Sequence, residues 1–301
     1  MRVAAIDCGT NSIRLLIADV AGETLTDVSR RMEIVRLGEG VDRTGRLAPE
    51  AIDRTRRALL GYAAEIAELG ISRIRMVATS ASRDASNAAD FRSMVHTVLG
   101  VDPEVITGEE EARLSFTGAV RGLSAEPPYL VVDIGGGSTE FVTGRSTSEQ
   151  AISVDIGCVR MTERHLKSDP PTPAEIAAAE QDITAAVDRA LAAVPGREAK
   201  TLLGLAGSVT TVTALALDLP AYEASRIHHT PVSYETVAKV TADLLAATVA
   251  ERRALPVMHP GRADVIGAGA LILRTVMERA AQPTVIASEH DILDGIAWGL
   301  A

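Results

Sequence analysis

The chain has 301 residues, a length that suits two domains of about 150 residues each. Apolar residues make up 47% and charged residues 23% of the sequence, which is the balance of an ordinary globular protein and not of a disordered one. The net charge of −10 and the aromatic content of 3% argue against binding to nucleic acid or to an anionic membrane surface. An anionic substrate must therefore be held by a local site.

No segment combines the length and the apolarity of a membrane span. Asp7 interrupts the apolar N-terminal stretch, which argues against a signal peptide. The longest uncharged run, residues 201–217, contains four threonines and is shorter than the ~20 apolar residues that a span needs. Cys8 and Cys158 are the only cysteines and are too few for a disulfide framework. We therefore expect a cytoplasmic protein that binds no membrane.

In chain order, the first half of the sequence predicts a hairpin, a helix, a strand and a second helix. Strands are indicated by short apolar runs between polar turns, and helices by apolar residues at intervals of three and four. Thr107 is expected to cap the second helix, with Glu110 as its capping-box partner. The expected bounds are 3–20 for the hairpin, 49–69 for the first helix, 74–78 for the strand and 107–120 for the second helix.

The second half begins with residues 122–128, whose glycine, serine and paired prolines are expected to form a hinge. Thr172, Pro173 and Glu175 together predict a helix start, because they suit its cap, its first position and its third position. The expected elements are a hairpin at 130–143, a helix at 172–194, a strand at 201–206, a turn at Gly207-Ser208, a helix to about Leu217 and a last helix at about 288–301.

The two hairpins are copies of one pattern. In each, a short buried strand ends in an aspartate, Asp7 or Asp133, and a turn rich in Gly, Ser and Thr leads into the return strand. The two aspartates are 126 residues apart, which is about the length of a domain. Such a duplication implies two similar α/β domains that face each other across a cleft. We expect these domains at residues 1–124 and 125–287.

The two turns suit an anion such as phosphate. The sequence has neither the P-loop pattern nor the dinucleotide-binding pattern, and each glycine turn leads into a second strand and not into a helix. Small residues let backbone amides approach an anion, and Thr10, Ser12, Ser138 and Thr139 add hydroxyl donors. The aspartate before each turn would repel that anion unless a divalent cation lay between them, so the pair of turns implies Mg²⁺.

Four segments together resemble the signatures of a known family. They are D-C-G-T-N-S at residues 7–12, T-S-A-S-R-D-A at 79–85, G-E-E-E-A-R-L at 108–114 and D-I-G-G-G-S-T-E at 133–140. In order and approximate spacing they resemble the exopolyphosphatase / guanosine pentaphosphate phosphatase (Ppx/GppA) family. The fourth segment is highly specific. Weaker motifs at residues 157–163, 207–208 and 262–264 extend the resemblance over essentially the whole chain.

This resemblance implies a fold and a reaction. The fold is that of two ribonuclease-H-like domains, as in actin, sugar kinases and Hsp70, with the active site in the cleft and the last helix packed back on the first domain. The resemblance also implies that longer family members have additional C-terminal helical domains that help to hold long polyphosphate, and we expect no such domain in this sequence. The expected reaction is therefore Mg²⁺-dependent hydrolysis of the terminal phosphate of short polyphosphate. Hydrolysis of pppGpp stays open, because the sequence hardly separates the two substrates.

The resemblance also implies roles for individual residues. Glu111 matches the family's proposed catalytic base, and its place in the first turn of a helix favours an ionised carboxylate. Arg83 would clamp a phosphate. Asp133 and Glu140, with Asp7 as a lesser candidate, would hold Mg²⁺ or another divalent ion. The expected phosphate-binding residues are Gly9, Thr10, Asn11, Ser12, Gly135, Gly136, Gly137, Ser138, Thr139, Gly207 and Ser208.

Two functions of other classes stay open at this point. One is an ATP-dependent kinase of the same fold, with adenosine bound near residues 207–208. The other is a catalytically silent relative that binds a guanosine alarmone or a partner protein. Cys8 and Cys158 are expected in the core, His228-His229 in a loop, and His290 isolated from other histidines. The resemblance also favours a homodimer.

Overall fold

The computed structural model describes all residues of the chain, 1–301, and they form two compact units. Unit 1 comprises Met1–Gly118 and Asp291–Ala301, and unit 2 comprises Ala119–His290. The sequence predicts domain boundaries at 124/125 and 287/288, whereas the chain passes from one unit to the other at 118/119 and 290/291. The expected cleft between two domains stays a prediction. None of the helices has the length and apolarity that a membrane crossing requires.

Unit 1 is built on a mixed sheet of five strands in the order β3-β2-β1-β4-β5. The first three strands pair antiparallel, and β4 and β5 run parallel to β1. This is the strand order and direction of a ribonuclease-H-like sheet. The strands are β1 (Arg2–Cys8), β2 (Ser12–Ala21), β3 (Thr24–Ile34), β4 (Ile74–Ala78) and β5 (Glu104–Val105).

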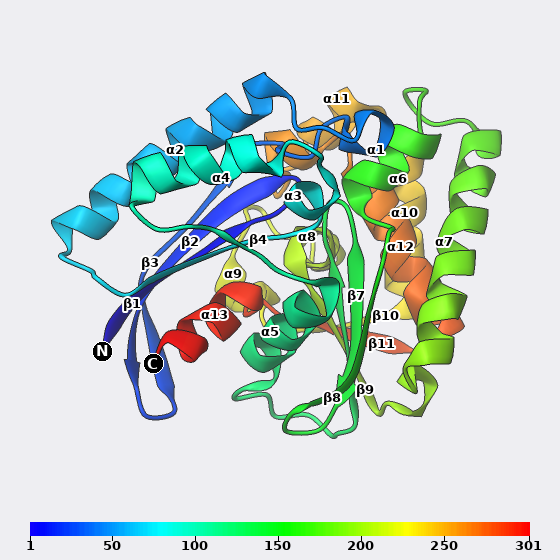
Figure 1. Ribbon diagram of the computed structural model, residues 1–301. Coiled ribbons are helices and arrows are strands. Elements are labelled where there is room, and N and C mark those ends of the chain that lie inside the picture. The colour runs from blue at the N-terminus through cyan, green and yellow to red at the C-terminus, as the bar shows by residue number, and fades with distance from the viewer. The chain divides into compact units, whose positions relative to one another are not determined.

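The helices of unit 1 lie on both faces of this sheet (Figure 1). They are α1 (Val41–Thr44), α2 (Pro49–Glu68), α3 (Ser80–Asp84), α4 (Ala88–Leu99), α5 (Gly108–Val120), which ends just past the unit boundary, and α13 (Ile292–Leu300). Figure 1 shows α2 and α4 on one face and α13 on the other. The unit therefore has three layers, with the sheet in the middle.

The alternation of side chains along β1 assigns each residue to one of these layers. Ala4 and Ile6 pack in a core cluster with α2 and α4, whereas Val3 and Ala5 pack in another cluster with α13. Since successive side chains of a strand point to opposite faces, Asp7 lies on the α13 face. The alternation of side chains along β1 thus places the carboxylate of Asp7 on the face that α13 covers.

Helices α5 and α13 approach each other backbone to backbone. A Cβ added at Gly295 would lie 2.1 Å from the carbonyl oxygen of Leu114, and one added at Gly118 would lie 1.9 Å from the carbonyl oxygen of Asp291. Only glycine fits at these two positions, because the opposing atoms belong to the main chain. The two glycines therefore fix how closely α13, and Asp291 before it, is seated in unit 1.

Unit 2 repeats the sheet plan of unit 1 and adds one edge strand. Its order is β10-β11-β9-β6-β7-β8, and β6 pairs antiparallel with β7 and parallel with β9, as β1 does with β2 and β4. The additional strand β10 pairs antiparallel with β11. The strands are β6 (Tyr129–Ile134), β7 (Thr139–Gly144), β8 (Ser148–Val154), β9 (Thr201–Leu205), β10 (Pro231–Ser233) and β11 (Thr284–Ala287).

Helix α12 is the centre of the helical layer of unit 2. It is buried along nearly its whole length and packs against α6, α7, α8 and α10 (Figure 1). Two short 3₁₀ helices, Gly196–Glu198 and Pro260–Arg262, complete the unit. The helices are α6 (Cys158–His165), α7 (Pro173–Ala193), α8 (Ala206–Ala216), α9 (Ala224–Ile227), α10 (Tyr234–Ala246), α11 (Val249–Arg253) and α12 (Ile266–Arg279).

Most expected elements are present with nearly the expected bounds, and one is corrected. Thr172 caps α7 with the reciprocal capping box that Glu175 predicts. The turn expected at Gly207-Ser208 is wrong, because both residues lie in the first turn of α8. Ala206 adopts a φ of 67°, in the left-handed region, so a single residue redirects the chain from β9 into the helix.

The seating of α13 gives a first prediction. We expect Gly295→Ala to lower the free energy of unfolding by about 1–3 kcal/mol or more, because its Cβ would meet main-chain atoms that have no room to move. Gly299→Ala in the same helix is the matched control, since its Cβ would meet only Arg75 Nη1 at 3.6 Å. Urea unfolding compares the two, and equal stabilities would contradict this account.

Glu175 gives a second prediction, on pH. Its carboxylate accepts hydrogen bonds from the backbone amides of Thr172, Lys167 and Ser168. These hydrogen bonds, of which the one from Thr172 has the largest effect, lower the pKa of Glu175 from 4.5 to about 2. Because the folded-state pKa is the lower one, the carboxylate stabilises the fold fully above pH 4.5 and loses this effect as the pH falls toward 2. The stability gap between wild type and Glu175→Gln should therefore close over that range in denaturant titrations. A gap of constant size would argue against it.

Candidate phosphate-binding and catalytic site

The first glycine turn joins β1 to β2 in unit 1. The Gly9 amide donates to the Ser12 carbonyl at 2.9 Å and closes the turn. Three backbone amides of residues 35–38 then hold it: the Thr10 carbonyl accepts one at 2.9 Å, and the Asn11 carbonyl accepts two, at 2.8 and 3.0 Å. The carbonyl oxygens of the turn are thus directed at the segment that follows β3.

The second glycine turn joins β6 to β7 in unit 2 with the same closing hydrogen bond, from the Gly135 amide to the Ser138 carbonyl at 3.0 Å. Here the N-terminus of α6 holds the turn. Backbone amides of residues 158–160 donate to the Gly135 carbonyl at 3.0 Å and to the Gly136 carbonyl at 2.9 and 3.1 Å. The side-chain Nε of Arg160 also donates to the Gly137 carbonyl, at 2.7 Å.

In both turns, some backbone N–H groups therefore point away from the segments that hold the turn. In a planar peptide the carbonyl and the following N–H point in opposite directions, so anchored carbonyls direct the amides of Asn11, Gly136 and Gly137 the other way. None of the backbone hydrogen bonds of the turns uses these amides as donors. The second turn also requires Gly157, where a Cβ would lie 2.4 Å from the Gly136 carbonyl. Consecutive free amides of this kind suit an anion.

The hydroxyl groups of the turns are partly committed to the protein. Thr10 Oγ1 and Ser80 Oγ lie 2.8 Å apart and share a hydrogen bond, which ties the first turn to α3. The Thr139 hydroxyl donates to the Ile156 carbonyl at 2.6 Å, which commits its proton to the protein, and phosphate binding by Thr139 stays a prediction. Ser138 is 2% exposed. Backbone amides, more than hydroxyls, are what the second turn offers to an anion.

Arg83 and Glu111, the two residues expected to be catalytic, lie together in unit 1. Nη1 of Arg83 donates to the Ile106 carbonyl at 2.9 Å and lies 3.4 Å from a carboxylate oxygen of Glu111. Nε and Nη2 of Arg83 have no protein acceptor, so they are available to a ligand. Ser80, which bonds Thr10, is on the same short helix as Arg83. The first turn, Arg83 and Glu111 thus form one connected group.

The two hairpins differ in the residue that faces the aspartate. In the strand register, Arg14 lies directly opposite Asp7, and Glu140 lies directly opposite Asp133. Directly opposite residues of an antiparallel pair share one face of the sheet. The first hairpin therefore carries an ion pair, 2.6 Å between the closest atoms, whereas the second carries two carboxylates.

Asp133 and Glu140 are chemically suited to a divalent cation. They are 8% and 1% exposed, and Glu140 accepts the Ser153 hydroxyl at 2.7 Å. Two carboxylates on one face of a strand pair supply the oxygen ligands that a divalent cation prefers. Mg²⁺ is usually held by one or two carboxylates, with water and phosphate completing its shell. Three or more His, Cys, Asp or Glu side chains do not gather into a metal-binding group anywhere in the chain.

Asp7 offers only one carboxylate oxygen to a ligand. Arg14 donates to Oδ2 from Nε at 3.1 Å and from Nη2 at 2.6 Å, whereas Oδ1 is buried and has no hydrogen-bond partner. Burial raises the pKa of Asp7 above its ordinary value, and the charge of Arg14 opposes that rise. A buried unpaired carboxylate oxygen calls for an ion or a water, so Asp7 fits a single-oxygen contact with a cation.

Gly207 and Ser208 are occupied by contacts within unit 2. The Arg262 guanidinium covers Gly207, where a Cβ would lie 2.2 Å from Nη2, and Nη1 of Arg262 donates to Thr211 Oγ1 at 2.9 Å. Ser208 is 3% exposed and lies beside Cys158, which is buried. A phosphate-binding role for Gly207 and Ser208 stays a prediction.

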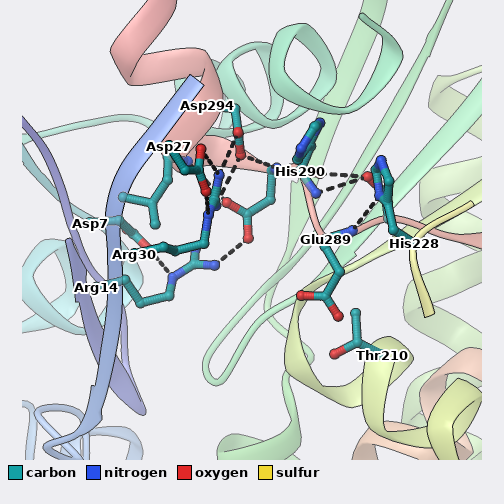
Figure 2. A network of polar contacts seen from close by, with 12 residues as sticks. Asp7, Arg14, Asp27, Arg30, Thr210, His228, Glu289, His290 and Asp294 are labelled. Atoms are coloured by element: carbon teal, nitrogen blue, oxygen red, sulfur yellow. Dashed lines mark hydrogen bonds and ion pairs between the residues drawn. The ribbon is translucent and has the colours of Figure 1, made fainter. Parts of the chain in front are cut away.

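Unit 1 contains an ion network that the sequence did not predict. Figure 2 shows Arg14 directed at Asp7, and Arg30 directed at Asp27 and Asp294. Arg14 has a signal in the sequence, because a hairpin centred on the glycine turn places it opposite Asp7. Arg30 pairs with Asp294 across 264 positions, so no local pattern reveals it.

Three histidines of unit 2 lie together, which corrects the expectation that His290 is isolated. The His228 ring stacks on His229 at a centroid distance of 3.7 Å. The His228 and His290 rings, which Figure 2 shows near each other, have centroids 4.4 Å apart. The Glu289 amide donates to His228 Nδ1 at 3.1 Å. The pairing of β10 with β11 brings these distant segments side by side.

Comparisons with known proteins extend over the whole chain. The model of the Ppx/GppA phosphatase family matches residues 16–300. Exopolyphosphatase 2 of Mycobacterium tuberculosis is 52% identical over 100% of this chain and 98% of its own.

Two solved structures show the same fold. The crystal structure of an exopolyphosphatase-like protein superposes with a TM-score of 0.96 at 43% identity, covering 99% of this chain and 98% of its own. The Ppx/GppA family member of Aquifex aeolicus superposes with a TM-score of 0.84 at 32% identity, covering 100% of this chain and 98% of its own. Because the family model matches and the similarity to these relatives extends over the whole length of the chain, the chain belongs to the Ppx/GppA phosphatase family.

Proposed function

We propose that the protein is an exopolyphosphatase that hydrolyses the terminal phosphate of short polyphosphate chains and releases orthophosphate. Membership of a phosphatase family supports hydrolysis of a phosphate bond. Identity of 52% to a protein named exopolyphosphatase 2 supports polyphosphate as the substrate. The net charge of −10 supports short chains, because the field of an acidic protein repels a long polyanion.

The contact between Arg83 and Glu111 is the observation that carries the proposal. Nε and Nη2 of Arg83 are free, and a guanidinium with two free donors suits bidentate binding of a phosphate. A phosphate held there lies beside the Glu111 carboxylate, because the two side chains are 3.4 Å apart. The first turn, tied to the same short helix through Thr10 and Ser80, supplies a backbone amide for a further phosphate oxygen.

In this arrangement Glu111 accepts a proton from the attacking water. The water oxygen forms a bond to the terminal phosphorus while the bond from that phosphorus to the bridging oxygen breaks. The electron pair of the broken bond stays on the shortened chain, and orthophosphate leaves. Arg83 and the backbone amides stabilise the charge on the phosphoryl oxygens throughout the reaction.

Each of the two hairpins, taken by itself, carries carboxylate oxygens that fit a divalent cation. Asp133 and Glu140 would hold Mg²⁺ in unit 2, and the unpaired Oδ1 of Asp7 is the oxygen that unit 1 offers. When bound, Mg²⁺ supplies positive charge that neutralises phosphoryl oxygens. Mn²⁺ prefers the same oxygen ligands and is expected to substitute for it.

We also propose the reducing cytoplasm as the setting of the protein. Cys8 and Cys158 are free and buried, and burial raises the pKa of both thiols, which keeps them protonated and unreactive. A homodimer is proposed from the family resemblance alone. Sedimentation of the purified protein measures the oligomeric state.

Phosphate release measured side by side on short polyphosphate and on pppGpp, with Mg²⁺ present, tests the proposed function. We expect release from polyphosphate without any acceptor molecule. Release of phosphate from pppGpp alone would show that pppGpp, and not polyphosphate, is the substrate. Phosphoryl transfer from ATP to an acceptor would assign a kinase, and the absence of all three activities would assign a silent relative.

The role of Glu111 has a matched control in the same helix turn. We expect Glu111→Ala to lower kcat by at least ~10²-fold, the usual effect of removing a general base, with the fold intact by circular dichroism. Glu109→Ala should leave kcat unchanged, since this side chain is 67% exposed and contacts only Arg113, at 3.8 Å. Near-normal turnover by Glu111→Ala would place the base elsewhere.

A further inference from the structure

Arg14 joins Asp7 to the start of the last helix. From β2 it donates Nε and Nη2 to Asp7 Oδ2, and it donates Nη1 to Asp291 Oδ2. The Arg14 side chain is 20% exposed and each aspartate side chain is 6% exposed. Because a guanidinium presents its donors in one rigid plane, carboxylates bonded to two of its edges are fixed relative to each other.

Asp291 is itself fixed by hydrogen bonds at the start of α13. It is the N-cap residue of α13: its Oδ1 accepts the Leu293 amide at 3.0 Å, and its own amide donates to Asp294 Oδ2 at 2.9 Å. The backbone contact at Gly295 seats the same helix on α5. A continuous series of contacts therefore runs, within unit 1, from the packed helix α13 to the carboxylate of Asp7.

These contacts decide what Asp7 can offer to a ligand. Arg14 occupies Oδ2 twice, and Oδ1 is left buried without a partner. Without Arg14, the carboxylate would be free to rotate about its terminal torsion and to present either oxygen. A buried charge with no partner is also costly. The guanidinium therefore supplies both orientation and compensating charge.

We propose that Arg14 is a positioning residue which, held by Asp291, orients Asp7 so that Oδ1 alone is presented to a divalent cation. This inference rests on the proposed function, since it gives Arg14 a part in the metal binding proposed there. It also gives α13 a role beyond covering the sheet, because the N-cap residue of that helix, Asp291, holds the arginine that orients Asp7.

Arg30 distinguishes positioning from simple anchoring of α13. It lies on β3 and donates to Asp294 Oδ1 at 2.7 Å and to Asp27 Oδ2 at 2.8 Å, so it ties the same capping box to the same sheet (Figure 2). No contact links Arg30 to Asp7. If Arg14 only anchored the helix, removing either arginine would have the same consequence.

Binding of Mn²⁺ alone to the full chain, followed by electron paramagnetic resonance, tests the proposal without substrate. We expect Arg14→Met and Asp291→Asn to raise the Kd for Mn²⁺ by about tenfold or more, the usual cost of losing a partner that orients a metal ligand. Asp291→Asn preserves the helix cap, because asparagine caps as well as aspartate. Arg14→Lys, which keeps the charge without the fork, should lie between wild type and Arg14→Met. Arg30→Met should match wild type.

Several results would overturn the proposal. They are unchanged or tighter Mn²⁺ binding in Arg14→Met and Asp291→Asn, an equal loss in Arg30→Met, wild-type affinity in Asp7→Asn, and absence of Mn²⁺ binding to wild type. Thermal unfolding identifies variants that are not folded, and if Arg14→Met is among them, Arg14→Lys and Asp291→Asn decide. Failure of the proposed function is a separate result: wild type would release no phosphate, while the Mn²⁺ comparison would still decide the role of Arg14.

Discussion

The direction of a few peptide groups is the constraint on which the candidate site depends. In both glycine turns the carbonyl oxygens are bound by amides from neighbouring segments, residues 35–38 in unit 1 and the start of α6 in unit 2. Planarity then directs the amides that follow them away from those segments. The two turns reach the same result with unrelated partners. In unit 2 the close approach of α6 to the turn requires Gly157, which stands at the N-cap of that helix.

The duplicated hairpins share their geometry and differ in their charge. The same register places Arg14 opposite Asp7 and Glu140 opposite Asp133. One substitution at equivalent positions thus separates an ion-paired hairpin from an acidic one. The acidic hairpin suits a cation through two carboxylates, and the ion-paired hairpin offers one oxygen whose direction is set by its neighbours. A sheet plan that is repeated almost unchanged carries two different chemistries.

What the sequence predicted well was encoded over short distances. The hairpins, β4 and the capping box of α7 each depend on residues close together in the chain. The assignment of Arg83 and Glu111 to one site came from family motifs, and periodicity alone would not have paired them. Helix α12, which is buried along nearly its whole length, was not predicted. The bond of Arg14 to Asp291 joins positions 277 residues apart, which no local signal encodes.

Helix α13 belongs to unit 1 but follows the whole of unit 2 in the chain. Its residues Ile292, Leu293 and Ile296 cover the sheet face that contains Val3 and Ala5. On the ribosome, that face is made long before its cover, so it stays open to solvent and to chaperones while unit 2 is synthesised. The N-cap carboxylate that holds Arg14 arrives at the same late moment. The order of translation therefore makes this part of unit 1 one of the last to mature.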